Sequence, residues 1–319
     1  MVVLATSAFL ASAASTHALQ SAILGNDWSI LDPSTSYCLD LWRRNFKADA
    51  PEGTLAHKQR SWDRAAIDEG KAVLLTMANS PSDVARLLAV SSHAGDWLNA
   101  LPISSCGLRF GDDVVRVGVG LRLGLQICES HRCVCDSMVD QQGLHALSCK
   151  FGIGRLSRHG MLNDIVHRAF TSAGIPAMKE PTGLVKGCAL RPDGLTLIPW
   201  AEGRFLAWDL TMTHTLAPTN LVHSVHVAGF AAEAAADRKL IKYASLSPSH
   251  LFVPVALETH GPFCKAALDL FVDLGRRIAE WTGDPREGAF LFQRVSIAIQ
   301  RGNAAALHGS FGEVSTGWL

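Results

Sequence analysis

The chain has 319 residues, of which 48% are hydrophobic and 18% are charged, and its formal net charge is zero. This length is enough for two ordinary domains, and the composition is typical of a globular protein, not of a disordered one. A chain without net charge has no global positive field that would attract nucleic acid.

The N-terminal segment, residues 1–25, is apolar and rich in small residues, which predicts a helix. The first basic residue of the chain is Arg43, so the basic region that opens a signal peptide is missing. The segment also contains Ser, Thr, His and Gln, which are too polar for a membrane span. We interpret it as a helix cut from a larger context, and we expect an intracellular protein, nuclear or cytoplasmic and not secreted.

Residues 26–100 predict further helices, so that residues 1–100 form a helical N-terminal region. Ser80-Pro81-Ser82-Asp83 is typical of a helix start, because a Ser N-cap is followed by Pro at the first helical position. Further on, Gly111-Asp112-Asp113 predicts a turn before a strand over Val114–Leu125.

Four of the eight cysteines crowd into the segment from Cys128 to Cys149. This uneven distribution is typical of a metal site in a reducing compartment and not of a disulfide framework. A closed structural zinc site needs four thiolate or imidazole ligands. We predict these ligands from the CxC…HxxxC spacing, with Cys128 and His131 as spare candidates: Cys133, Cys135, His145 and Cys149. The alternative is a set of free buried cysteines.

The segment after the cysteines predicts alternating helices and strands. A helix carries Leu162, Val166 and Phe170 at helical spacing, and a short strand follows at Ala177–Glu180. Beyond residue 213, helices are expected over residues 225–246, 266–281 and 290–306, and a strand over residues 251–258. This order predicts an α/β fold with a mixed β-sheet flanked by helices.

Residues 191–213 predict a β-hairpin with a five-residue loop, Pro199 to Gly203. If the loop is centred on Ala201, Asp193 lies opposite Asp209. Two carboxylates that face each other across paired strands need a cation, and clustered oxygen ligands suit magnesium. The alternative is that both aspartates are solvated residues at strand ends.

With the zinc ligands, Arg191-Pro192-Asp193 and Asp209 in this order, the chain resembles the C-terminal region of site-specific non-LTR retrotransposon proteins. That region carries a CCHC zinc knuckle followed by a restriction-like endonuclease of the PD-(D/E)xK superfamily. The resemblance covers roughly residues 90–300. It implies a strand and the zinc knuckle within residues 101–150 and the endonuclease domain within residues 151–319.

The resemblance also implies the roles of the hairpin acids and of a nearby helical acid. The first metal-binding aspartate falls on Asp193, the second acid on Asp209, and the helical acid that often precedes the motif on Asp164. The lysine usually found two residues after the second acid is replaced by Thr211.

The retrotransposon branch is similar in placing its lysine on the following helix, which points to Lys239 or Lys242. We favour Lys239 as the catalytic one. Lys242 adjoins Tyr243 nearer the helix end and reaches a DNA phosphate more easily.

The implied activity is magnesium-dependent hydrolysis of a DNA phosphodiester, a nick in a target site, with RNA of the parent element as a second partner. No reverse-transcriptase motif is present, so we expect a fragment or remnant of a longer element protein. Residues 150–242 contain eleven Lys and Arg against seven Asp and Glu, a local excess of positive charge. The residues expected to contact nucleic acid are Arg155, Arg158, Arg168 and Arg191.

Two other functions remain open at this point. One is a nucleic-acid-binding module that contains zinc but whose nuclease site no longer works. The other is a structural or interaction protein, in which the zinc only stabilises the subdomain and the hairpin acids are surface charges. Magnesium-dependent cleavage separates the nuclease from the binding module, and salt-sensitive DNA binding separates the binding module from the structural protein.

Overall fold

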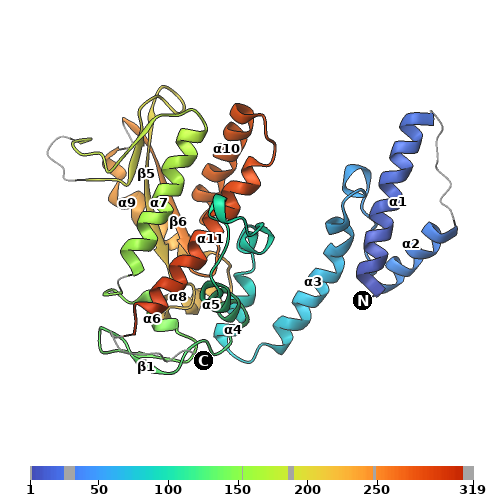
Figure 1. Ribbon diagram of the computed structural model, residues 1–319, viewed down its shortest axis with the longest axis horizontal. Helices are drawn as coiled ribbons and strands as arrows, with labels where there is room; N and C mark the ends of the chain where they lie inside the picture. Colours follow the sequence, from blue (N-terminus) through green and yellow to red (C-terminus); the bar gives the residue numbers. More distant parts are fainter. Residues whose placement is uncertain (1, 25–32, 153, 186–189, 247–248, 312–319) are drawn as a thin grey trace. The chain divides into compact units, whose positions relative to one another are not determined.

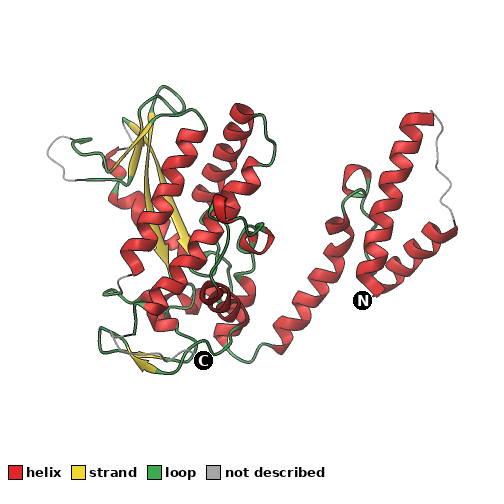
Figure 2. Cartoon of the chain, viewed as in Figure 1, coloured by secondary structure: helices red, strands yellow, loops and turns green. Residues whose placement is uncertain are grey.

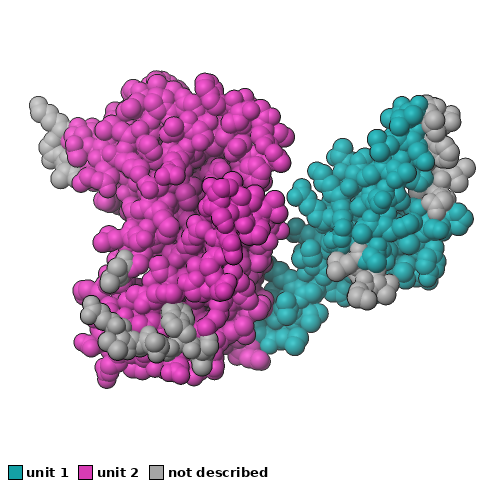
Figure 3. Space-filling model, in the orientation of Figure 1, with its two compact units in different colours: residues 1–78 teal, residues 79–319 magenta. Residues whose placement is uncertain are grey.

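The computed structural model describes residues 2–24, 33–152, 154–185, 190–246 and 249–311 (Figure 1). The chain divides after Ala78 into two compact units, which Figure 3 shows in different colours. Residues 79–100, which the sequence grouped with the N-terminal helices, therefore belong to the second unit.

The first unit is helical, as predicted. It contains α1 (Val2–Leu24), α2 (Pro33–Phe46), the 3-10 turn η1 (Gly53–Leu55) and α3 (Gln59–Met77). Its centre holds Trp42 and Trp62, whose rings meet edge to face at 5.3 Å while Trp42 Nε1 donates to the Trp62 carbonyl at 3.1 Å. Among the described residues, no helix combines the length and the hydropathy that a membrane crossing needs.

The second unit begins with α4 (Pro81–Leu88), the 3-10 turns η2 (Asp96–Asn99) and η3 (Ser104–Cys106), and α5 (Asp112–Leu123). Ser80 caps α4 as predicted, because its hydroxyl accepts the Asp83 backbone N–H at 3.1 Å.

The strand predicted over Val114–Leu125 is wrong, because most of that segment is the helix α5. Its Val and Gly residues alternate as in a strand, yet the buried positions Val117 and Leu121 lie one helical turn apart. The ends also favour a helix. Asp112 and Asp113 occupy the first turn, and Gly124 ends the helix with a left-handed φ of 70°.

A mixed four-stranded sheet forms the centre of the second unit, in the order β3-β4-β5-β6 (Figure 2). Antiparallel pairs join β3 (Ala177–Lys179) to β4 (Gly194–Thr196) and β4 to β5 (Phe205–Thr213). The strand β6 (His250–Glu258) runs parallel to β5. A separate two-stranded ribbon, β1 (His131–Arg132) with β2 (Met138–Val139), lies near the short helix α6 (Leu144–Ser148).

Helices cover both faces of this sheet, as the α/β prediction requires. On one face Trp208 of β5 stacks on Phe170 of α7 (Gly154–Ser172), with ring centroids 4.7 Å apart. On the other face Ala207 shares a buried cluster with Tyr243, which follows α9 (Phe230–Lys242). The remaining helices are α8 (Pro218–Ser224), α10 (Lys265–Thr282) and α11 (Glu287–His308).

Candidate functional site

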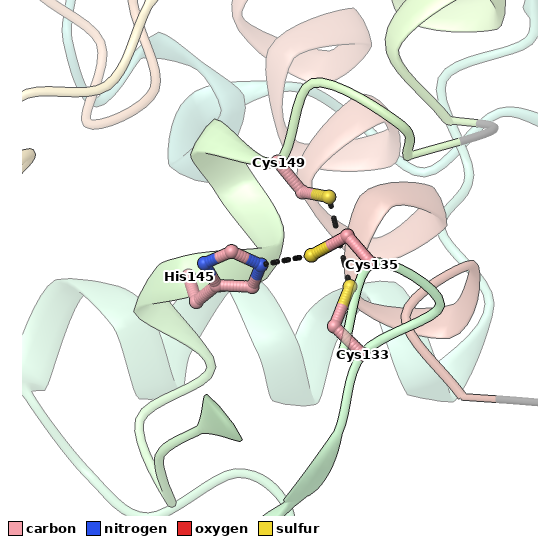
Figure 4. A group of neighbouring side chains, drawn as sticks. All are labelled: Cys133, Cys135, His145 and Cys149. Atoms are coloured by element: carbon pink, nitrogen blue, oxygen red, sulfur yellow. Dashed lines mark hydrogen bonds between the residues drawn. The ribbon is translucent and has the colours of Figure 1, made fainter. Parts of the chain in front are cut away.

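The four predicted zinc ligands lie together between the β1–β2 ribbon and the end of α6 (Figure 4). One ligand atom from each of them lies within 4.8 Å of all the others. The Cys133 and Cys149 sulfurs are 3.6 Å apart, and Cys135 Sγ lies 3.1 Å from His145 Nε2. Two sulfurs bonded to one tetrahedral zinc at ~2.3 Å would be about 3.8 Å apart. This Cys₃His cluster can therefore hold a metal ion such as zinc.

The sequence places these ligands through two local structures. Asp136, with a left-handed φ of 66°, turns the chain between the two short strands, so Cys133 and Cys135 sit on one tight loop. His145 lies on α6 and Cys149 directly after it, one turn apart. A hydrogen bond with Ser137 lowers the pKa of the Cys135 thiol to about 6, whereas burial raises that of Cys133 to about 11.

The two spare candidates are not part of the cluster. Cys128 is buried, and its thiol lies 3.4 Å from the Asp140 carbonyl. His131 stacks on Phe311 and has Nε2 2.8 Å from the Ser310 hydroxyl. Both side chains thus have other partners, and the four-ligand set needs neither.

The hairpin of β4 and β5 has the predicted register. Gly194 pairs with Trp208 and Leu195 with Ala207, which sets Asp193, just before β4, opposite Asp209 in β5. The chain turns back at Glu202 and Gly203, between the bridged residues Ala201 and Arg204, so the tight turn lies just after the predicted centre, Ala201. Asp209 thus lies within β5, and Asp193 lies directly before β4.

Asp209 is buried, with 4% of its surface exposed, and faces α9. Its Oδ2 forms an ion pair with the Lys239 ammonium. Its Oδ1 accepts a hydrogen bond of 2.5 Å from the Tyr243 hydroxyl. Burial, together with the neighbouring Asp209 carboxylate, raises the pKa of Tyr243, so this phenol stays protonated and remains a donor. Lys242 contacts the same hydroxyl, at 3.0 Å, and not the carboxylate.

Asp193 contacts α7 through His159 and is less buried, with 16% of its side chain exposed. Its Oδ2 accepts the Leu210 backbone N–H at 2.5 Å and lies 3.0 Å from His159 Nε2. The hydrogen bond with Asp193 raises the pKa of His159, against the opposing effect of burial. Asn163, one turn along α7, donates to the Asp193 carbonyl at 3.1 Å and accepts from Trp208 Nε1 at 2.9 Å. These contacts fix the Asp193 end of the hairpin against the helix.

Asp164 does not join the hairpin acids. It forms an ion pair with Lys179 of β3, and 47% of its side chain is exposed. No group of three Asp, Glu, His or Cys ligand atoms that includes Asp164, Asp193 or Asp209 is found in the described part of the chain. The helix turns about 100° per residue, so it directs Asn163 and His159 to the hairpin and carries Asp164 to another side.

The four arginines expected to contact nucleic acid are separated. Arg155 and Arg158 line one cleft, together with Arg238. Arg168 lines a different cleft on α7, with Asp164 and Arg294. The fourth, Arg191, forms an ion pair with Glu180, and its carbonyl oxygen lies 3.0 Å from the Tyr243 hydroxyl.

Three residues of this site were absent from the predicted set: His159, Asn163 and Tyr243. Tyr243 carried a usable signal, because it lies four residues after Lys239 and so shares its side of the helix. His159 and Asn163 are likewise four apart, but only the packing of α7 on the hairpin shows which side of that helix meets Asp193.

Comparisons with known proteins do not assign a family: no protein-family model and no curated protein matches this sequence.

Proposed function

We propose that this protein is a metal-dependent DNA endonuclease with a restriction-like fold, preceded by a structural zinc knuckle. One observation carries the proposal: the Lys239 ammonium meets Asp209, which the hairpin sets opposite Asp193. An acid directly before β4, an acid in β5 and a lysine of α9 resemble the PD-(D/E)xK arrangement with a displaced lysine. The sequence resemblance supports the same function.

The carboxylates fit magnesium as a minimal donor set. Magnesium is commonly held by one or two protein carboxylates together with substrate phosphates and water. Asp193 and Asp209 would hold the ion, and a bound magnesium would act as a Lewis acid at the phosphate and supply an activated water. With two acids alone, we expect tight metal binding only when DNA contributes the remaining oxygens.

The residues around the acids have separate tasks in this mechanism. Lys239 balances the charge that develops on the phosphate in the transition state. Tyr243 orients the Asp209 carboxylate, and the Leu210 N–H and His159 orient Asp193. The hydrogen bond with Asp193 raises the pKa of His159, and the ring lies where it can relay a proton from water.

The zinc knuckle would be structural. All four ligands of the Cys₃His cluster come from the protein, which leaves no open position for substrate or water. Zinc bound there would tie the β1–β2 ribbon to α6 and to the start of α7, next to the cleft that contains Arg155 and Arg158.

A second function has one observation in its favour. Both oxygens of Asp209 already have partners in the chain, and a third carboxylate does not lie with the pair in the described residues. Such a neutralised pair is also what a catalytically inactive zinc-containing nucleic-acid-binding module would retain.

The test is nicking of supercoiled plasmid by the full chain with and without magnesium. Asp193→Asn and Asp209→Asn should each abolish nicking and leave DNA binding intact, because losing negative charge does not weaken phosphate contacts. Their effects should be non-additive, since both acids hold one ion. Asp164→Asn is the matched control and should nick at the wild-type rate.

Nicking that persists in either the Asp193 or the Asp209 variant refutes the assignment. If the wild-type protein binds DNA in a salt-sensitive manner but does not nick it, the protein is the inactive binding module.

A further inference from the structure

A basic cleft lies beside the Cys/His cluster, at the end of β5 where the starts of α7 and α8 meet α9. Its volume is ≈ 570 Å³. Six of its lining residues are basic or imidazole side chains, and none of its lining residues in the described part of the chain is Asp or Glu. They are Lys150, Arg155, Arg158, His214, His223 and Arg238.

Arg158 is the most unusual of these residues, because only 5% of its surface is exposed. Its Nη2 donates to the Leu147 carbonyl at 3.4 Å, and its Nη1 has no hydrogen-bond partner among the described residues. A buried guanidinium normally has a carboxylate beside it, because an unpaired buried charge is costly. Here the neighbouring charge is another cation, Arg155. Burial, together with this charge, lowers the pKa of Arg158 to about 10. Arg158 therefore stays charged at neutral pH.

The position of Arg158 is fixed by the helix behind it. A Cβ atom added at Gly302 of α11 would come within 2.4 Å of Arg158 Cγ. Because Gly302 has no side chain, the aliphatic part of Arg158 fits against α11, and the guanidinium lies at the cleft.

His214 supplies a second buried group without a full set of partners. Only 4% of its surface is exposed, and its Nδ1 lies 2.8 Å from the Thr259 hydroxyl. Its Nε2 has no partner within the described residues. Burial lowers the pKa of His214 well below its usual value, so the ring is neutral at pH 7. When the Thr259 hydroxyl donates to Nδ1, the neutral ring carries its proton on Nε2, where it can serve as a donor.

We propose that this cleft binds a phosphate group, with Arg158 and His214 as the buried contacts and Lys150, Arg155 and Arg238 as the exposed cations at its rim. Several cations without a neighbouring acid are better balanced by the two negative charges of a phosphate than by the single charge of a carboxylate. The rim cations form no ion pair among the described residues, so they are available to the ligand. The cleft is larger than a phosphate alone, so the group would be carried by a larger molecule.

Two sources share this chemistry: a small phosphorylated molecule and the backbone of a nucleic acid. The cleft adjoins the hairpin acids, since Arg155 and His159 are one turn apart on α7 and Arg238 directly precedes Lys239 on α9. Phosphate binding does not require nuclease activity. It can therefore be tested even if the protein does not nick DNA.

The experiment is titration of the zinc-loaded full chain with inorganic phosphate by calorimetry, at constant ionic strength. Arg158→Gln should weaken phosphate binding about tenfold or more, because it removes a charge-assisted hydrogen bond. Arg155→Gln is exposed and cannot disturb the core, and it should weaken binding severalfold. Arg168→Gln, an exposed arginine on the same helix that lines another cleft, is the matched control and should leave binding unchanged.

A second arm distinguishes the two sources. A short single-stranded oligonucleotide that displaces phosphate identifies the backbone of a nucleic acid, and one that does not displace it identifies a small phosphorylated molecule. The proposal is overturned if phosphate does not bind the wild-type protein. It is also overturned if Arg155→Gln and a folded Arg158→Gln bind phosphate as tightly as Arg168→Gln does.

Discussion

The Lys239 ammonium lies on the buried carboxylate of Asp209, so a helix and a strand are joined by an ion pair at the centre of the proposed site. The pair is largely shielded from water, because 24% of the Lys239 side chain and 5% of the Asp209 side chain are exposed. Removing one partner of such a pair leaves the other charge uncompensated, which is more costly than removing both.

Lys239→Met should therefore lower the free energy of unfolding by about 2–3 kcal/mol, somewhat less than the ~3–5 kcal/mol of a fully buried pair. Adding Asp209→Asn should restore part of this loss, because it removes the stranded charge. Urea denaturation measures both. The control is Lys265→Met, whose ion pair with Asp269 is exposed, and little change is expected there. A double variant that is less stable than Lys239→Met would contradict the buried-pair interpretation.

The contact between His159 and Asp193 predicts a pH dependence of stability. The pKa of His159 is raised in the folded protein above its usual value of 6.5. Its contribution is therefore fully present below pH 6.5 and is lost as the pH rises through the raised value. The stability difference between the wild type and His159→Gln should be larger at pH 5.5 than at pH 8.5.

Denaturation curves at the two pH values test this prediction. His226→Gln, an exposed histidine, is the control and should show the same difference at both. A larger effect of His159→Gln at the alkaline pH would show that the ring is not stabilised in its charged form.

The Cys₃His cluster predicts one tightly bound zinc per chain. Metal analysis after dialysis should find it in the wild type and in Cys128→Ser, because Cys128 lies outside the cluster. Cys149→Ser should lose most of the metal. Acid should release zinc as well, since the thiolate ligands take up protons. A folded wild-type protein without stoichiometric zinc would eliminate the metal site, and zinc lost from Cys128→Ser would change the ligand set.

The parts of this site that the sequence predicted are those that depend on short-range geometry. The Cys₃His set follows from a tight loop and one helical turn. The pairing of Asp193 with Asp209 agrees with the predicted register, although the tight turn lies at Glu202 and Gly203 and not at Ala201. Lys239 was a candidate because the sequence predicts a helix over residues 225–246, which the structure shows as α9. Such features need no knowledge of how distant segments pack.

The predictions that were wrong concern segments whose sequence fits two different structures. Residues 114–125 have both a strand-like alternation and a helical spacing, and burial against α11 selects the helix. The resemblance implied Asp164, whereas its neighbour Asn163 contacts the hairpin, because one residue on a helix is a rotation of about 100°. The packing of α7 on the hairpin therefore replaced the expected carboxylate with an amide and an imidazole.

Tyr243 gives the last prediction. Its ring stacks on Phe252 with centroids 4.6 Å apart, while its hydroxyl donates to Asp209 at 2.5 Å. Tyr243→Phe keeps the ring packing and removes only the hydroxyl, so Asp209 Oδ1 loses its donor inside the protein. A hydrogen bond to a charged group contributes about 1.5–3 kcal/mol, and a loss of this size is expected in urea denaturation. If Tyr243 orients Asp209 for metal binding, the variant should also need more magnesium to reach half of its maximal nicking rate. A Phe variant with wild-type stability and wild-type magnesium dependence would show that Lys239 alone positions the carboxylate.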